Sequence, residues 1–130
     1  MILGSGVDLI AVARYEREVA RRGLSLVEEL FSARELAWCR RRRRPAEGYA
    51  MLYAAKEALF KALATGKVGR MAWSDVQVAW PDGAASQPAM ALAGESAAVA
   101  AAMGVTGVHL ATAMTKTLAV AWVVIEGTRD

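Results

Sequence analysis

The segment between Leu52 and Leu63 constrains the fold most, because its apolar residues recur at the spacing of an α-helix. At about 100° per residue, Leu52, Leu59 and Leu63 form one stripe, which Ala55 and Ala62 flank. Such a stripe is typical of the core-facing side of an amphipathic helix. We therefore expect a long helix here, with one side buried against the rest of the chain.

Two charged residues interrupt this apolar segment. Glu57 and Lys61 lie four residues apart, so both project from the rim of the buried side. A carboxylate can hold a hard cation and a lysine can hold a phosphate, so together they suit a metal-bound phosphate ester. The alternative is an ordinary surface pair, which is common on helices at this spacing.

A second carboxylate, Asp8, lies near the start of the chain. It stands in the short apolar run ILGSGVDLI at residues 2–10, where an acidic side chain is costly to bury unless it is paired or bound to metal. Asp8 is therefore a second candidate for a paired or metal-bound carboxylate. The alternative is that Asp8 only caps the helix that follows, since aspartate is a favoured N-cap residue.

Several sequence blocks together carry a resemblance to a known family. They are GVDLI at 6–10 followed by Arg14, FSAREL at 31–36, and AAKEA at 54–58 followed by Lys61-Ala62 and Thr65-Gly66. Further blocks lie at 73–78, 87–92, 108–110 and 119–126. In their order, spacing and total length, the chain resembles holo-acyl-carrier-protein synthase, the small type of 4′-phosphopantetheinyl transferase.

The resemblance implies an α+β fold of the 4′-phosphopantetheinyl transferase type, with a long helix packed on a small, mainly antiparallel sheet, in one domain spanning residues 1–130. It also implies a reaction. The phosphopantetheine arm of coenzyme A would pass to a serine of an apo acyl carrier protein, releasing adenosine 3′,5′-bisphosphate. Phosphoryl transfer of this kind depends on positioning and charge neutralisation.

The same resemblance suggests roles for individual residues. Asp8 and Glu57 would share a Mg²⁺ ion, and Lys61 would act with them by meeting a phosphate. Lys56 points about 100° away from Glu57, so we expect it to contact a phosphate or the carrier protein instead. Gly66 would let the backbone approach the nucleotide, although a helix C-cap explains this glycine equally well.

The predicted helix at residues 12–22 has one apolar and one basic side, with Gly23 as its C-cap. The apolar positions are Val12, Tyr15 and Val19, and the basic positions, called the cationic ridge below, are Arg14, Arg17 and Arg21. A solvated face would explain such a ridge. In the resembled family, however, the first helix receives the acidic helix of acyl carrier protein, so we expect the ridge to bind that partner.

Two positions depart from the family pattern. Met114 stands where many relatives have a histidine, and Leu52 stands where they often have an arginine. His109 is retained as a candidate cofactor-binding residue, although a lone strand histidine is more often structural. If the enzyme is active, the base is then a water bound to the metal. The alternative is a non-catalytic or specialised homologue that binds carrier protein or coenzyme A.

Composition and charge indicate the partners. Of the 130 residues, 55% are hydrophobic and 22% are charged, which favours an oligomer; the resemblance implies a homotrimer with active sites between subunits. The net charge is +3, and five arginines occupy positions 40–44 before Pro45. This run could be a solvated loop, or it could attract phosphates or an acidic protein. A nucleic-acid-binding module would leave the carboxylates and Lys61 unexplained, so we expect no nucleic acid.

The remaining sequence supports a small cytoplasmic domain. No apolar run is long enough to span a membrane, the first residues do not read as a signal sequence, and Cys39 is the single cysteine. We expect a helix at 24–39 capped within it by Ser32 and Glu35, and a helix at 95–103. We also expect strands at 73–80 and 88–93 around a turn at 81–83, and a hairpin from strands 108–114 and 118–126.

Overall fold

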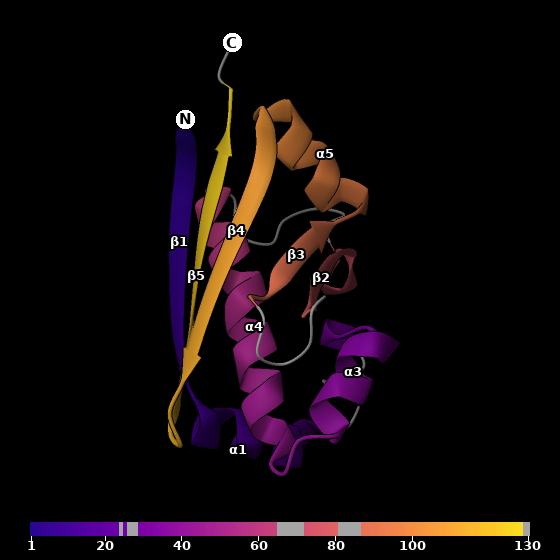
Figure 1. Cartoon of the computed structure of the whole chain (residues 1–130). Helices are drawn as coiled ribbons and strands as arrows, with labels where there is room; N and C mark the ends of the chain where they lie inside the picture. Colours follow the sequence, from indigo (N-terminus) through magenta and orange to yellow (C-terminus); the bar gives the residue numbers. More distant parts are fainter. Residues whose placement is uncertain (24, 26–28, 65–71, 81–86, 129–130) are drawn as a thin grey trace.

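Helix α4 (Pro45–Ala62) lies along one face of a three-stranded antiparallel sheet in the computed structural model (Figure 1). The model describes residues 1–23, 25, 29–64, 72–80 and 87–128. The strands β1 (Ile2–Ala11), β4 (Val105–Met114) and β5 (Leu118–Gly127) are ordered β1-β5-β4. Leu52, Leu59 and Leu63 are buried as their spacing predicted. The expected α+β fold is confirmed.

Strand β1 approaches α4 closely because two of its inward-facing positions, Gly4 and Gly6, are glycines. A Cβ atom added at Gly4 would collide with the carbonyl oxygen of Ala62, and one at Gly6 would collide with that of Ala58. Small residues on both elements therefore bring the two backbones together. The next inward-facing position on β1 is Asp8, so the same close approach carries its carboxylate onto the helix surface.

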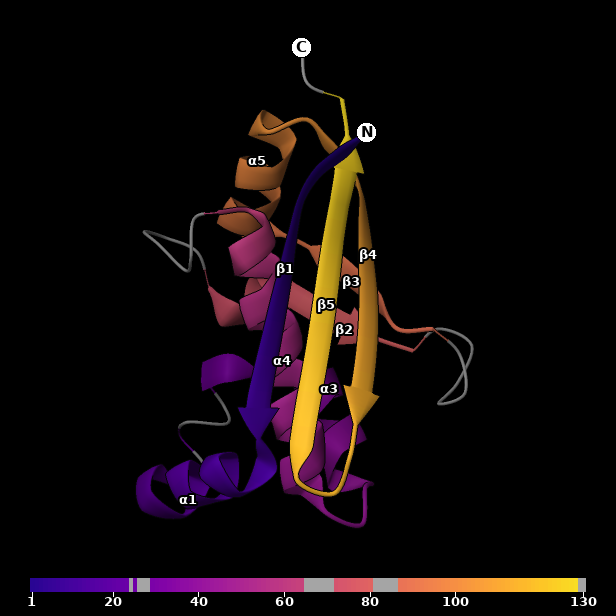
Figure 2. The ribbon, with the colours of Figure 1, turned by 90° about the vertical axis from the view of Figure 1, so that its left-hand side faces the viewer.

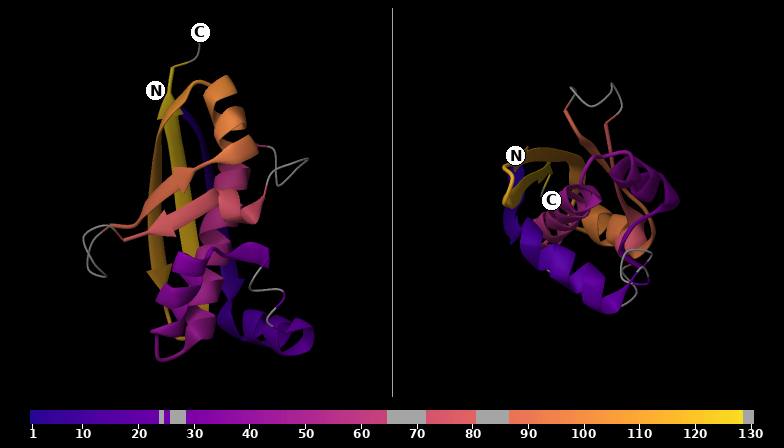
Figure 3. Two further views of the ribbon diagram at one scale, coloured as in Figure 1. Left: turned by 90° about the vertical axis from the view of Figure 1, so that its right-hand side faces the viewer. Right: turned by 90° about the horizontal axis from the view of Figure 1, so that it is seen from below.

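A second layer covers the other side of α4 (Figure 3). It contains α3 (Ala33–Arg40), the 3-10 turn η1 (Trp73–Asp75) and the antiparallel ribbon of β2 (Val76–Ala79) with β3 (Ala89–Leu92). Helix α5 (Gly94–Ala102) lies near the start of β4, and α1 (Val12–Arg22) lies at the end of β1 (Figure 2). Helix α4 is thus enclosed on two sides, which explains why twelve of its 18 residues are buried, Lys56 among them.

Two local expectations need correction. The segment at 24–39 is not one helix, because the chain breaks at Ser32 and α3 begins at Ala33; the predicted capping box between Ser32 and Glu35 is present. The strand expected at 73–80 begins with η1 and is extended only at 76–79. Pro45, which follows the arginine run, begins α4, where its missing N–H has no intrahelical partner to lose.

The other predicted elements agree within a few residues. Helix α1 has the expected bounds, and Gly23 follows it with φ 75°. The turn expected at 81–83 and the position of Gly66 lie outside the described residues. No helix in the described part of the chain is long and apolar enough to cross a membrane.

The face of the three-stranded sheet that points away from α4 carries large apolar side chains in the open. Val7 and Leu9 on β1 and Leu118 and Trp122 on β5 are all exposed, and Trp122 is 57% exposed. Val7 lies directly opposite Trp122 in the strand register, so these residues form one continuous surface, called the outer sheet face below. A surface of this kind on a small domain indicates a contact with another protein.

Candidate active site

Asp8 and Lys61 meet where β1 crosses the last turns of α4. The Lys61 ammonium donates to Oδ1 of Asp8 over 2.9 Å and to the carbonyl oxygen of Val7 over 3.1 Å. The Asp8 side chain is 17% exposed and that of Lys61 is 51% exposed, so the pair opens to solvent on one side. Asp8 does not cap α1, because β1 continues to Ala11 and that residue precedes the helix.

Glu57, one helical turn before Lys61, lies near enough to the Asp8 carboxylate to be affected by its charge. Partial burial and then the negative charge of Asp8 raise the pKa of Glu57, whereas Lys61 and a hydrogen bond with Tyr53 act to lower it. Two carboxylates that repel each other at a solvent-open edge are relieved by a hard cation with oxygen ligands. The structure therefore brings together the three predicted residues Asp8, Glu57 and Lys61 (the carboxylate–lysine cluster below).

This donor set fits a hydrated Mg²⁺ ion. No group of three or more histidine, cysteine or acidic side chains suited to a metal occurs among the residues that the structure describes. Two protein carboxylates leave most coordination positions to water and substrate oxygens, which is the arrangement that Mg²⁺ prefers at phosphate sites. Asp8 and Glu57 are the side chains that would hold the ion.

Lys56 occupies a different place from the one expected. Its side chain is fully buried, and its ammonium donates to Oε1 of Glu35 over 2.8 Å and to the carbonyl oxygens of Leu30 and Trp73 over 2.9 and 3.0 Å. A lysine has three donors, so all of them are engaged. The expected contact of Lys56 with a phosphate or a carrier protein is therefore corrected to a buried ion pair.

The cationic ridge lies on the exposed side of α1, as its periodicity predicted. Arg14 and Arg17 are exposed, and Arg21 is paired with Glu18 over 2.8 Å. Helix α1 packs against α4, where the rings of Tyr15 and Tyr53 lie 5.7 Å apart, and a cavity of about 210 Å³ beside this contact is lined by both Arg14 and Tyr53. Because Tyr53 stands one helical turn before Glu57 on α4, the ridge adjoins the carboxylate–lysine cluster.

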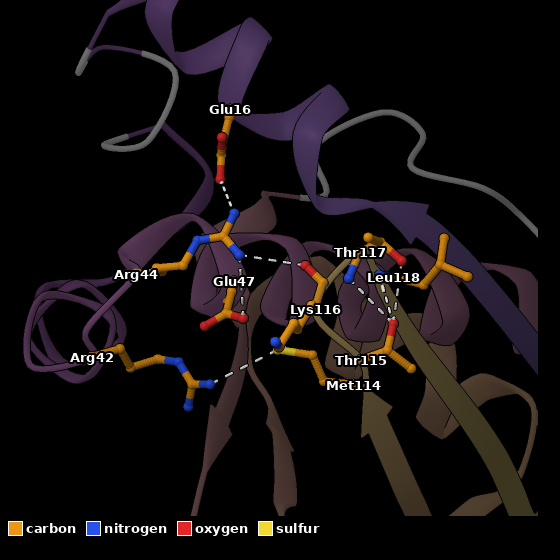
Figure 4. Close-up of polar contacts among 9 residues, drawn as sticks. All are labelled: Glu16, Arg42, Arg44, Glu47, Met114, Thr115, Lys116, Thr117 and Leu118. Atoms are coloured by element: carbon orange, nitrogen blue, oxygen red, sulfur yellow. Dashed lines mark hydrogen bonds and ion pairs between the residues drawn. The ribbon is translucent and has the colours of Figure 1, made fainter.

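The arginine run at 40–44 is exposed at four of its five positions, as a solvated loop would be. Arg44 nevertheless contacts Glu16 of α1 over 2.6 Å, Glu47 of α4 over 3.8 Å and the carbonyl oxygen of Lys116 over 3.4 Å (Figure 4). One guanidinium thus connects the first helix, the long helix and the turn between β4 and β5.

Arg42 points to Met114, where the resemblance leads us to expect a histidine. Its Nη2 lies 3.8 Å from Sδ of Met114 (Figure 4), and its guanidinium lies 4.9 Å from the ring centre of Trp38. Trp38 in turn stacks on Trp80 at 4.3 Å. Trp38, Trp80 and Arg42 line a groove of about 360 Å³ beside β4, called the tryptophan groove below. Sequence reasoning missed it, since the Arg42–Met114 contact joins residues 72 positions apart.

His109 is not part of the carboxylate–lysine cluster in this chain. It lies on the outer sheet face, opposite Val124 in the register, with Nε2 2.7 Å from Oε1 of Glu126. Asp8 lies on the face toward α4 and on the other edge strand. Leu52, the second departure from the family pattern, is fully buried in the core and offers no charge.

The fold and the carboxylate–lysine cluster define a class of small α+β enzymes that act on phosphate esters. The model of the 4′-phosphopantetheinyl transferase superfamily matches residues 4–120, and the chain belongs to this superfamily. It is 44% identical to a holo-[acyl-carrier-protein] synthase of Desulforudis audaxviator over 98% of this chain and 95% of that one. It is 41% identical to one of Alkalilimnicola ehrlichii over 97% and 98% of the two chains.

Solved structures of holo-[acyl-carrier-protein] synthases have a similar fold. The crystal structure of holo-[acyl-carrier-protein] synthase from Neisseria meningitidis matches with a TM-score of 0.87 and 25% identity over 97% of this chain and 99% of that one. The holo-(acyl-carrier-protein) synthase of Bacillus anthracis in complex with CoA (3′,5′-ADP) matches with a TM-score of 0.78 and 28% identity, over 98% and 99%.

Proposed function

We propose that this chain is a holo-[acyl-carrier-protein] synthase. It transfers the 4′-phosphopantetheine group of coenzyme A to a serine of an apo acyl carrier protein and releases adenosine 3′,5′-bisphosphate. The carboxylate–lysine cluster carries the proposal, because it places two oxygen ligands and an ammonium at one solvent-open edge. The names of the relatives, and the CoA bound in the Bacillus anthracis structure, support the same substrates.

The proposed chemistry uses few groups of the protein. When bound, Mg²⁺ supplies positive charge that neutralises the pyrophosphate of the donor. Asp8 and Glu57 hold the ion. Lys61, which is one helical turn after Glu57 and contacts Asp8, donates to a phosphate oxygen of the donor. The transfer then depends on in-line placement of the serine hydroxyl and on charge stabilisation, which such phosphoryl transfers require. His109 is assigned no direct part within one chain.

The active unit proposed is a homotrimer with sites between subunits. The outer sheet face of one chain exposes Val7, Leu9 and Trp122, which association would bury. In addition, the carboxylate–lysine cluster lies at strand β1 and the tryptophan groove at strand β4, the two edges of the sheet. A heterologous contact between copies offers a way to bring these two features together. The groove, with aromatic walls and the Arg42 guanidinium, suits the nucleotide end of coenzyme A.

The acyl carrier protein is proposed to dock on the cationic ridge, which adjoins the carboxylate–lysine cluster through Tyr53. We further propose that the whole activity resides in the single domain 1–130, in the cytoplasm, in fatty acid biosynthesis. Carrier proteins of polyketide or peptide synthesis carry the same acceptor serine and are equally suitable acceptors for the proposed site.

The second candidate is a homologue that binds carrier protein or coenzyme A without catalysing transfer. Two observations favour it. Leu52 is buried without charge, and Met114 offers a thioether that accepts no proton. Arg42 restores a cation beside Met114, which is one reason for preferring the active enzyme.

The decisive experiment incubates the protein with coenzyme A, Mg²⁺ and an apo acyl carrier protein and follows the carrier by mass spectrometry. We expect the mass of one phosphopantetheine group to be added, and Asp8→Asn to abolish the addition. If the parent protein binds coenzyme A yet modifies no carrier protein of any pathway, the non-catalytic alternative is correct.

A further inference from the structure

The buried ion pair of Lys56 and Glu35 is more than a core contact. Glu35 accepts from the Lys56 ammonium and the Ser32 amide through Oε1, and from the Val78 amide through Oε2. Lys56 in turn donates to the carbonyl oxygens of Leu30 and Trp73. The pair therefore ties α4 to the start of α3, to β2 and to the first residue of η1.

Trp73, the residue whose carbonyl Lys56 holds, packs directly against α4. Its ring stacks on Tyr53 with the centroids 5.4 Å apart and the planes inclined by 28°. It also meets the ring of Phe60 edge to face at 5.3 Å. The backbone and the ring of Trp73 are thus both fixed, so the place of the Tyr53 ring is fixed with them.

Tyr53 completes the connection to the carboxylate–lysine cluster. Glu57 stands four residues after Tyr53 on α4, which places the Tyr53 hydroxyl beside the Glu57 carboxylate, where it acts to lower the carboxyl pKa. The connection therefore runs from Glu35 to Lys56, then to Trp73, Tyr53 and Glu57. The steps as far as Tyr53 are hydrogen bonds and a ring contact, and the last step is the i,i+4 spacing on α4.

We propose that Lys56 and Trp73 are positioning residues, which hold Tyr53 so that it orients the Glu57 carboxylate for a divalent cation. The inference rests on the proposed metal site at Asp8 and Glu57. Lys56, the residue before Glu57, would then orient this metal ligand through its buried contacts, without touching the metal itself. Groups that orient a metal ligand by hydrogen bonding typically change metal affinity by about 10-fold to 100-fold when removed.

The experiment measures Mg²⁺ binding to the free protein by calorimetry, without coenzyme A or carrier protein. We expect Tyr53→Phe and Lys56→Met each to weaken Mg²⁺ binding about tenfold, because each removes one polar step of the connection. Trp73→Ala is expected to weaken it as well, and Trp73→Phe to restore most of the affinity by keeping an aromatic ring against Tyr53.

Stability is controlled separately, because removing one partner of a buried ion pair is strongly destabilising. Leu110→Ala, a core truncation on the far edge strand β4, provides a variant of reduced stability outside the connection. It should bind Mg²⁺ as the parent does. If Lys56→Met does not fold, the Trp73→Ala and Trp73→Phe pair still decides the question, since neither exposes a buried charge.

The outcomes separate this inference from the proposed function. If the parent and Glu57→Gln bind Mg²⁺ equally, the metal site and the inference both fail. If Glu57→Gln loses Mg²⁺ but Trp73→Ala, Tyr53→Phe and Lys56→Met retain the parent affinity, the metal site stands and the positioning role is wrong.

Discussion

The ammonium of Lys61 lies 2.9 Å from Oδ1 of Asp8, between two elements that meet only because β1 carries glycines at its inward positions. Lys61 neutralises one carboxylate, whereas Glu57 keeps a raised pKa beside it. The geometry thus holds two acidic groups near each other, with one basic group at the same solvent-open edge.

The first prediction concerns the metal ligands. Asp8→Asn and Glu57→Gln should each lower kcat/KM for Mg²⁺-dependent transfer by about 100-fold or more, because neither remaining carboxylate holds the ion well alone. Both variants should keep the parent circular dichroism spectrum. Transfer at the parent rate by both variants would contradict the assignment of the site.

The second prediction concerns carrier-protein docking. Arg14→Glu combined with Arg21→Glu should weaken carrier-protein binding at least about tenfold and reduce its dependence on salt, since the charges attract an acidic partner. Affinity for coenzyme A should not change. Arg34→Glu, an exposed arginine on α3 outside the cationic ridge, is the charge-matched control. Equal losses for carrier protein and coenzyme A would indicate damage to the fold instead.

The third prediction concerns His109 and Met114. Because His109 pairs with Glu126 on the outer sheet face, His109→Ala should keep activity within about tenfold of the parent. Met114→His should raise activity only modestly, since Arg42 already places a cation there. If the parent protein is active and His109→Ala abolishes that activity, His109 is the base. If the parent protein is inactive and the combined substitutions Met114→His and Leu52→Arg make it active, the non-catalytic alternative is correct.

The fourth prediction concerns assembly. Trp122→Glu places a charge in the centre of the outer sheet face and should shift the molecular mass in light scattering from trimer to monomer. Ala102→Glu, an exposed position on α5, should leave the trimer intact. A parent protein that is monomeric at micromolar concentration would exclude the trimer altogether.

The fifth prediction concerns alkaline pH. Burial raises the pKa of the Cys39 thiol from 9.0 to about 12. Between these two values the unfolded chain releases the thiol proton while the folded chain keeps it, so the free energy of unfolding falls as pH rises. Burial of Tyr15 acts in the same direction, whereas the lowered pKa of Lys56 opposes it.

Urea titrations between pH 9 and 11 measure this effect. Cys39→Ala should show a shallower fall in stability over that range, even if its lost packing lowers the whole curve. A variant whose stability falls as steeply as that of the parent would show that Cys39 does not titrate in this range.

Local sequence patterns predicted much of the fold. The i, i+3, i+7 spacing gave both ends of α1, and Ser32 with Glu35 marked the start of α3. These features depend on contacts within a few residues, which the sequence displays directly. Helical spacing also paired Glu57 with Lys61, whereas only the family resemblance joined Asp8 to them; in the structure Lys61 contacts Asp8 and the Asp8 charge raises the pKa of Glu57.

The roles of Lys56 and Glu57 show where such reasoning stops. They are adjacent in the sequence and both are ionisable, yet Lys56 is fully buried against Glu35 and Glu57 lies at the solvent-open edge. The difference depends on α3 and η1 covering one side of α4, and those elements are distant in the sequence.

By itself, the sequence determined the class of fold, the helical faces and the residue types at the candidate metal site, because periodicity and capping are local properties of the chain. Only the tertiary structure decided which of those faces is covered. It buried Lys56, turned His109 away from Asp8, carried Arg42 to Met114 and left Trp122 exposed. Each of these outcomes depends on packing between segments far apart in the chain, where close approach and burial decide which charges reach a ligand and which stabilise the core.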